Sequence, residues 1–193
     1  MYLYIFGLTK TKYQNELTEK DPNSIYSIGK ISAYYSCQMY NRIFNIFACG
    51  AIFYNHESPR RSSEYVTQKI VENVCKIYYE KEKYLYLGDI SSKIDWGYAK
   101  DYVEAAWKIM QQKKPDFFII ASGKKHSVLD FVKKSFNHVG LDYKKYIKIE
   151  KKLFRPSRTV SLVGNTNKAK KIFKYKTKTS LDKLVSIMME NDL

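Results

Sequence analysis

Two residues separated by one helical turn, Tyr26 and Lys30, could act together in proton transfer. A phenol, whose ordinary pKa is about 10, is a poor base at neutral pH, and a nearby ammonium group favours its ionised form. Residues four apart on a helix project from one face. The pair therefore suits the oxidation of an alcohol. Among 18 tyrosines and 34 lysines and arginines, the same spacing also arises as a core tyrosine beside a solvated lysine.

A second group of polar residues spans Phe53 to Arg61 and reads Phe-Tyr-Asn-His-Glu-Ser-Pro-Arg-Arg. The run before it, residues 43–53, is β-branched and aromatic and too short to cross a membrane, so it predicts a buried parallel strand. Ligands of open α/β sheets bind beyond the carboxyl ends of such strands. Asn55 and His56 could hydrogen bond to a ligand there, and the two final arginines suit phosphate. The alternative is a solvated turn with a satisfied histidine.

The elements that would position these residues alternate between strands and helices. A helix capped at Ser24 should bury Ile28, Ile31 and Tyr35. A second helix, capped by Ser62 or Ser63, would place the polar turn at its N-terminus, where the helix dipole favours an anion. The predicted strands are residues 1–6, 43–53, 84–87 and 117–121, with weak alternation over 143–149, and the predicted helices are residues 24–42, 62–79, 98–112, 128–138, 167–173 and 180–190.

This order of elements predicts an α/β fold: an incomplete Rossmann-like parallel sheet with helices on its faces, plus a smaller C-terminal α/β lobe. The chain of 193 residues is long enough to bury a sizeable core. We place the boundary near Gly88, with residues 1–88 and 89–193 forming two interleaved parts.

Composition narrows the classes of partner. A net charge of +15 raises the expectation of an anionic partner, but the lysines are scattered along the chain, as coding bias would produce, and we disfavour nucleic acid. Three cysteines without short pairing predict a reducing compartment and neither disulfides nor a metal site. The chain lacks a targeting segment and any run of 18 apolar residues, so we expect a soluble cytoplasmic protein without a membrane partner.

The motifs resemble those of the GDP-mannose 4,6-dehydratases, a branch of the extended short-chain dehydrogenase/reductase superfamily. The resemblance covers nearly the whole chain, but the family's glycine-rich first third has no counterpart in this sequence. The matching motifs are Ser24-Ile-Tyr-Ser-Ile-Gly-Lys30, Asn55-His-Glu-Ser-Pro-Arg-Arg61, Tyr65-Val-Thr-Gln-Lys-Ile70, Leu85-Tyr-Leu-Gly88, Asp95-Trp-Gly97 with Ala99-Lys-Asp-Tyr-Val103, and Phe154-Arg-Pro156.

The resemblance implies a role for each matching residue. Residues 1–88 become the remnant of an NADP-binding domain, and residues 89–193 become mainly a sugar-nucleotide-binding lobe. The implied assignments are Tyr26 and Lys30 for catalysis; Lys30, His56 and Arg61 for NADP; and Asn55, Val66, Lys69 and Arg155 for the nucleotide sugar.

The chain also departs from the family pattern. Tyr2 and Tyr4 stand where the family has a catalytic hydroxyl residue and glutamate, Ile94 replaces an arginine, and Arg158 replaces an acid. Eliminating water needs a base, and tyrosine replaces a tuned carboxylate poorly.

We therefore expect a truncated relative of the enzymes that convert GDP-mannose to GDP-4-keto-6-deoxymannose, inactive alone. The alternative is a non-catalytic sugar-nucleotide-binding or regulatory subunit that pairs with a complete homologue or a separate N-terminal chain. We also expect self-association through the exposed sheet edges, and the resemblance implies that the helix carrying Tyr26 takes part in it.

Overall fold

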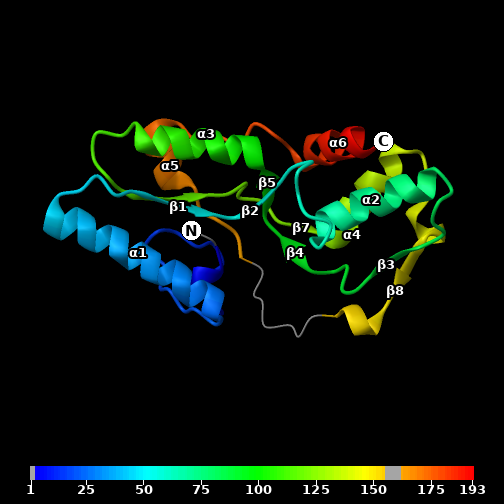
Figure 1. Cartoon of the computed structure of the whole chain (residues 1–193), viewed down its shortest axis with the longest axis horizontal. Helices are drawn as coiled ribbons and strands as arrows, with labels where there is room; N and C mark the ends of the chain where they lie inside the picture. The colour runs from blue at the N-terminus through cyan, green and yellow to red at the C-terminus, as the bar shows by residue number, and fades with distance from the viewer. Residues whose placement is uncertain (1–2, 155–161) are drawn as a thin grey trace. The chain divides into compact units, whose positions relative to one another are not determined.

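A computed structural model describes residues 3–154 and 162–193 and divides the chain into two compact units, each built from three stretches. The first unit takes residues 1–56, 95–125 and 158–178, and the second takes 57–94, 126–157 and 179–193. The colours of Figure 1 show the interleaving, since the first unit holds blue, green and orange helices. Gly88 lies inside the second unit rather than between the two.

The first unit is built on two parallel strands, β1 (Gly50–Phe53) and β6 (Phe117–Ile120), which pair in register from Gly50 with Phe117 to Phe53 with Ile120. Helices α3 (Ala99–Met110) and α5 (Asn167–Phe173) pack on one side and α1 (Ile25–Phe44) lies on the other (Figure 1). All four residues of β6 are buried, as expected of a parallel strand covered on both faces. The prediction of a parallel α/β arrangement is confirmed.

Helix α1 begins where the sequence predicts, because Ser24 and Ser27 form a reciprocal capping box. Its buried face agrees with the prediction only at Ile31, which is partly buried and packs against the core. Ser27 and Tyr34 are buried, and the ring of Tyr34 lies 4.6 Å from that of Phe117, whereas Ile28 and Tyr35 are 56% and 54% exposed. This helix carries apolar side chains on all of its faces, so the periodicity of its sequence alone could not identify the face that packs against the core.

The strands predicted over residues 1–6 and 43–53 both differ from the structure. Residues 3–6 form a single 3-10 turn, η1 (Leu3–Phe6), whose Ile5 and Phe6 join the core without pairing to a strand. Of the run over residues 43–53, only β1 is extended. Helix α1 continues to Phe44 and ends at Asn45, which adopts the left-handed conformation that closes many helices.

The strand after β1 carries part of the predicted polar group. β2 (Asn55–Glu57) pairs with β5 (Trp96–Tyr98), which leads into α3. Gly97 in β5 must be glycine, because an added Cβ would lie 2.3 Å from the ring of buried Tyr102. The close approach sets Tyr102 beside β2.

The second unit consists of three mutually packed helices and two small strand pairs. Its helices are α2 (Val66–Tyr78), α4 (Val128–His138) and α6 (Leu181–Asp192). Its strands are β3 (Leu85–Leu87) parallel to β8 (Ile147–Ile149), and β4 (Lys93–Ile94) antiparallel to β7 (His126–Ser127), with short turns η2 (Tyr143–Lys145) and η3 (Lys151–Leu153). Helix–helix packing, not a sheet, therefore forms the core of this unit.

The capping of α2 differs from the prediction. Tyr65 is the N-cap and makes no side-chain hydrogen bond to the helix, and neither Ser62 nor Ser63 is the cap. Tyr65 N instead donates to the Ser62 carbonyl oxygen, so residues 62–65 form a turn that delays the helix. Among residues 3–154 and 162–193, no helix is long and apolar enough to span a bilayer, and no three metal-ligating side chains gather.

Candidate functional site

Tyr26 and Lys30 lie together on the first turns of α1. The Lys30 ammonium group is 5.2 Å from the centre of the Tyr26 ring, within the range of a cation–π contact. The ring of Tyr26 is 56% exposed, so it is accessible to a ligand. The prediction that both side chains project from one helix face is confirmed.

His56 is held in a defined orientation after β1. Its ring lies 5.5 Å from Phe53 and 5.3 Å from Tyr102, and its Nδ1 is 2.8 Å from the Tyr54 carbonyl oxygen. Because a carbonyl oxygen only accepts, Nδ1 carries the proton, and a neutral ring then offers Nε2 as an acceptor to a ligand. Asn55 precedes His56 in β2 and is partly exposed.

Behind this segment, Tyr54 is tied to a loop that the sequence did not single out. Its hydroxyl donates to Gln14 Oε1 at 2.9 Å, and the Val163 amide donates to the same oxygen at 2.8 Å. Both side chains are fully buried, and burial raises the pKa of Tyr54 well above its ordinary value. Tyr54 is therefore a neutral structural donor. Gln14 lies in a polar stretch that gave no signal of burial.

Asp95 is a second buried residue that links separate segments by hydrogen bonds. Its carboxylate is 1% exposed and accepts from the amides of Ser122, Gly123 and Gly164 at 2.9, 3.1 and 3.2 Å, and also from the Ser122 hydroxyl. Burial raises the pKa of Asp95 to about 6, although these hydrogen bonds by themselves lower it. The residue joins the start of β5 to the loop after β6 and to Gly164. The sequence marked Asp95 only as part of a motif.

Arg61, expected at the cofactor, is engaged within the second unit. Its Nε lies 3.2 Å from Glu57 Oε2, and its guanidinium carbon is 3.4 Å from the centre of the Tyr65 ring. Thr67 donates to the same Glu57 oxygen at 2.7 Å. Any phosphate contact would have to use the outer guanidinium nitrogens.

The polar turn lies beside the N-terminus of α2, although the helix begins later than predicted. Helix α2 begins at Val66, and residues 62–65 separate it from Arg61 along the chain. Side chains of the turn still contact the start of the helix, because Thr67 in its first turn donates to Glu57 and the Arg61 guanidinium lies against the ring of the N-cap residue Tyr65.

The remaining predicted contacts lie on α2 or outside the described residues. Val66 and Lys69 are half-buried in the first turns of α2, and the Lys69 carbonyl accepts from Asn73 at 2.8 Å. Arg155 falls outside residues 3–154 and 162–193. The first unit thus brings together Tyr26 with Lys30 and Asn55 with His56, and the second holds Arg61, Val66 and Lys69.

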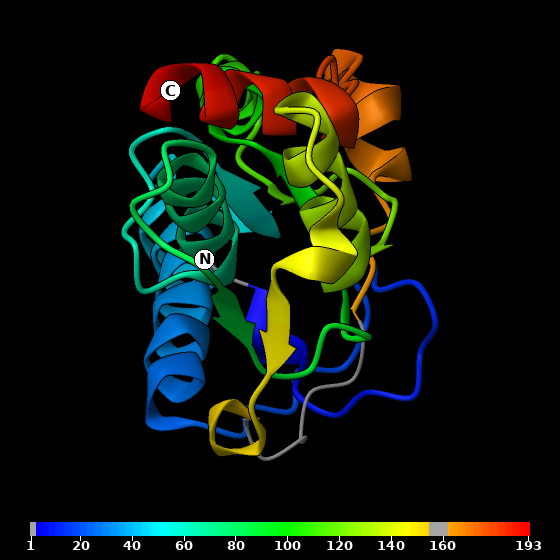
Figure 2. The ribbon, with the colours of Figure 1, turned by 90° about the vertical axis from the view of Figure 1, so that its right-hand side faces the viewer.

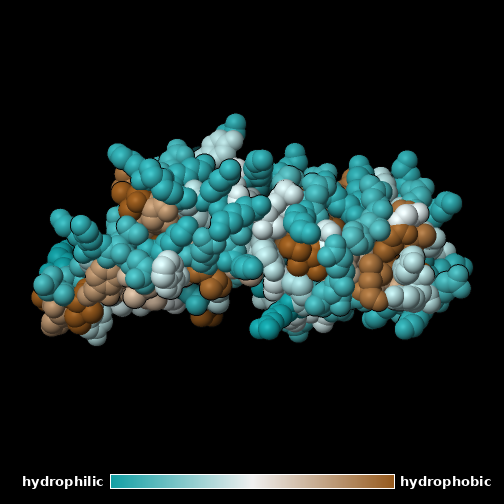
Figure 3. All heavy atoms as spheres, turned by 90° about the horizontal axis from the view of Figure 1, so that it is seen from above, coloured by the Kyte–Doolittle hydropathy of each residue, from teal (hydrophilic) through white to brown (hydrophobic). Residues whose placement is uncertain are grey.

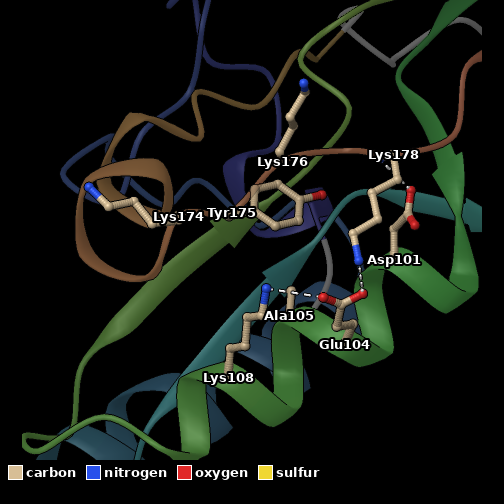
Figure 4. A pocket seen from close by; sticks show the side chains of 8 residues that line it. All are labelled: Asp101, Glu104, Ala105, Lys108, Lys174, Tyr175, Lys176 and Lys178. Atoms are coloured by element: carbon tan, nitrogen blue, oxygen red, sulfur yellow. Dashed lines mark hydrogen bonds and ion pairs between the residues drawn. The ribbon is translucent and has the colours of Figure 1, made fainter.

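A small open hollow lies against α3 in the first unit (Figure 4). The Lys178 amide donates to Asp101 at 3.0 Å, and Glu104 pairs with the ammonium groups of Lys108 and Lys178 at 3.0 and 2.6 Å. None of the predicted site residues lines it. These contacts of Asp101 and Glu104 with Lys178 tie the segment after α5 to α3.

The sequence is similar to one family of enzymes. The profile of the family "GDP-mannose 4,6 dehydratase" matches residues 4–188. Similar proteins include the GDP-mannose 4,6 dehydratase of Dictyostelium discoideum, 39% identical, and that of Homo sapiens, 36% identical. Each alignment covers 98% of this chain, but only 58% and 55% of those proteins. The chain therefore spans a little over half the length of these relatives.

Solved structures with a similar fold share little sequence. RMD from Pseudomonas aeruginosa, complexed with NADPH, gives a TM-score of 0.88 at 13% identity and covers 98% of this chain and 63% of its own. A dTDP-glucose 4,6-dehydratase from Bacillus anthracis, in complex with NAD, gives a TM-score of 0.83 at 21% identity. That match covers 97% of this chain and 58% of the dehydratase chain. At these identities the likeness establishes the fold, which is that of Rossmann-type dehydratases and epimerases.

Proposed function

Since the chain belongs to the GDP-mannose 4,6 dehydratase family, we propose that it is the sugar-nucleotide-binding and partly catalytic portion of an NADP-dependent dehydratase of GDP-mannose. Its main support is the placement of Lys30 over the ring of Tyr26 on an accessible helix face. In this role Tyr26 would take the proton of the sugar C4 hydroxyl, and Lys30 would stabilise the resulting charge. NADP would supply the acceptor for the hydride from C4.

The residues fit only part of the cofactor. Lys30 and His56 present polar groups suited to the nicotinamide and ribose side, while Arg61 is largely engaged by Glu57 and Tyr65. Among the eight glycines of the 193 residues, none form the G-x-G-x-x-G pattern that cradles a pyrophosphate. We infer that another segment or chain must supply the cradle, and that this polypeptide alone does not turn over.

The chain also lacks the base that the family uses to eliminate water from the sugar. Tyr4, at the position of the family's glutamate, lies in η1 and is 37% exposed. A phenol there is a weaker base than a tuned carboxylate for removing the C5 proton. This substitution also favours the alternative, a non-catalytic subunit that binds the sugar nucleotide beside a complete homologue.

GDP-mannose should raise the thermal unfolding midpoint of the chain, and Lys69→Ala should abolish most of that shift. A ligand that binds only the folded state stabilises it, and removing a charged hydrogen bond to the nucleotide sugar costs about 1.5 to 3 kcal/mol. Differential scanning fluorimetry with increasing GDP-mannose measures the shift.

The matched control is Lys76→Ala, an exposed lysine in the last turn of the same helix, which should keep the full shift. Equal losses in both variants would remove Lys69 from the site. Arg155→Ala should behave as Lys69→Ala does.

We further propose that the chain self-associates through α1. Side chains on this helix remain exposed although apolar, and brown and tan atoms gather at the lower left of Figure 3, on the side of the first unit. Apart from Tyr26, which we assign to the sugar, the largest exposed fractions belong to Ile25, Ile28, Tyr35, Ile43 and Phe44. An apolar surface of this kind on a folded domain usually marks an interface.

A further inference from the structure

The outward face of the β3–β8 pair in the second unit combines an exposed aromatic ring with lysines. The two strands are parallel and place Tyr86 directly opposite Lys148. Leu85 and Leu87 point into the core, whereas Tyr86 is 44% exposed. Figure 2 shows β8, in yellow, at the near surface with β3 beside it.

Contacts on this face hold positive charge around the exposed ring. The ammonium groups of Lys148 and Lys83 lie 4.8 and 5.4 Å from the centre of the Tyr84 ring. The Tyr84 ring in turn meets that of Tyr86 edge to face, with centres 6.3 Å apart. Tyr84 therefore anchors two lysines beside Tyr86.

Further lysines flank the strand pair. Residues 143–154 include a single acidic residue, Glu150, which pairs with Lys152 at 2.8 Å. The lysines of this stretch are Lys144, Lys145, Lys148, Lys151 and Lys152, and all are exposed. These five lysines are close together in the sequence, and the pairing of β3 with β8 adds Tyr86 and Lys83 to them. This face therefore carries a local concentration of positive charge beside an exposed ring, unlike the scattered charge that disfavoured nucleic acid.

We propose that this face binds single-stranded nucleic acid, with a base stacked on Tyr86 and the phosphates held by Lys148 and its neighbours. Proteins that bind single strands without sequence preference combine a basic track with exposed aromatic rings. An acidic peptide would satisfy the lysines but would leave the ring without a flat partner. This binding of single-stranded nucleic acid is separate from the proposed dehydratase role and needs neither NADP nor a sugar nucleotide.

The test is fluorescence anisotropy of the full chain with a labelled ten-nucleotide oligouridine at about 50 mM salt. Tyr86→Ala should weaken binding about ten-fold, because it removes a stacking platform, whereas Tyr86→Phe should keep the affinity. Lys148→Ala should weaken binding and lower the slope of log Kd against log salt by about 0.7. Circular dichroism of each variant establishes that the fold is retained.

Two matched variants control for charge and aromatic content elsewhere. Tyr13→Ala before α1 and Lys174→Ala after α5 alter exposed residues of the first unit, and both should leave the affinity unchanged. No binding by the unmodified chain, or equal weakening by Tyr13→Ala and Tyr86→Ala, would overturn the proposal. Equal affinity for a duplex of the same length, or equal competition by GDP or polyglutamate, would also overturn it.

Discussion

In a mixture with a separately expressed N-terminal portion of a complete relative, Tyr26→Phe should slow the conversion of GDP-mannose at least about 100-fold. The substitution removes only the hydroxyl that would exchange a proton with the sugar, and it keeps the ring beneath Lys30. The assay should use a chain that also carries Tyr4→Glu, which restores a carboxylate at the position of the family's base. Chromatography of the 4-keto-6-deoxy product measures the rate.

The control is Tyr35→Phe, which removes a hydroxyl from a similarly exposed tyrosine on the same helix and should leave the rate unchanged. Turnover that survives Tyr26→Phe would exclude Tyr26 as the acid–base group. No turnover with Tyr26 intact, even with Tyr4→Glu, would favour the non-catalytic subunit.

Asp95 should make the stability of the chain depend on pH between about 4 and 6. Burial raises its pKa in the folded state from the ordinary 3.8 to about 6, so the folded state binds this proton more tightly than the unfolded state does. Stability from this group is present below about pH 4 and is lost as pH rises through about 6. A shift of about two pKa units corresponds to roughly 3 kcal/mol.

Urea unfolding of the chain and of Asp95→Asn, measured from pH 4 to 7, isolates this contribution as the difference between two curves. Asp89→Asn is the control. Asp89 is an exposed acid whose pKa is lowered by hydrogen bonds from Ser91 and Ser92, so it titrates below that window. A difference curve for Asp95→Asn that is flat with pH would show that Asp95 is not the titrating group.

Local patterns in the sequence were enough to predict much of this structure. Helix α5 has the predicted bounds, and the capping box at Ser24 fixes the start of α1. Tyr26 and Lys30 meet because their spacing matches the helix repeat, which is a purely local constraint. β1 and β6 pair in parallel as their apolar character predicts.

Features that depend on partners distant in sequence could not be predicted in this way. Gln14 is buried because Tyr54 and Val163 bond to it, and Asp95 because amides at residues 122, 123 and 164 surround it. The exposure of Ile28 and the delayed start of α2 likewise depend on what each helix meets, not on its own pattern. Tertiary contacts therefore decided the burial and orientation of polar groups around the candidate site.

The central claim, that the chain binds the sugar nucleotide but cannot hold the dinucleotide alone, is tested most directly by calorimetric titration with each ligand separately. GDP-mannose should give a saturable heat that Lys69→Ala removes, and NADP should give none, because the 193 residues contain no pyrophosphate cradle. Saturable binding of NADP, or no binding of GDP-mannose, would contradict the claim.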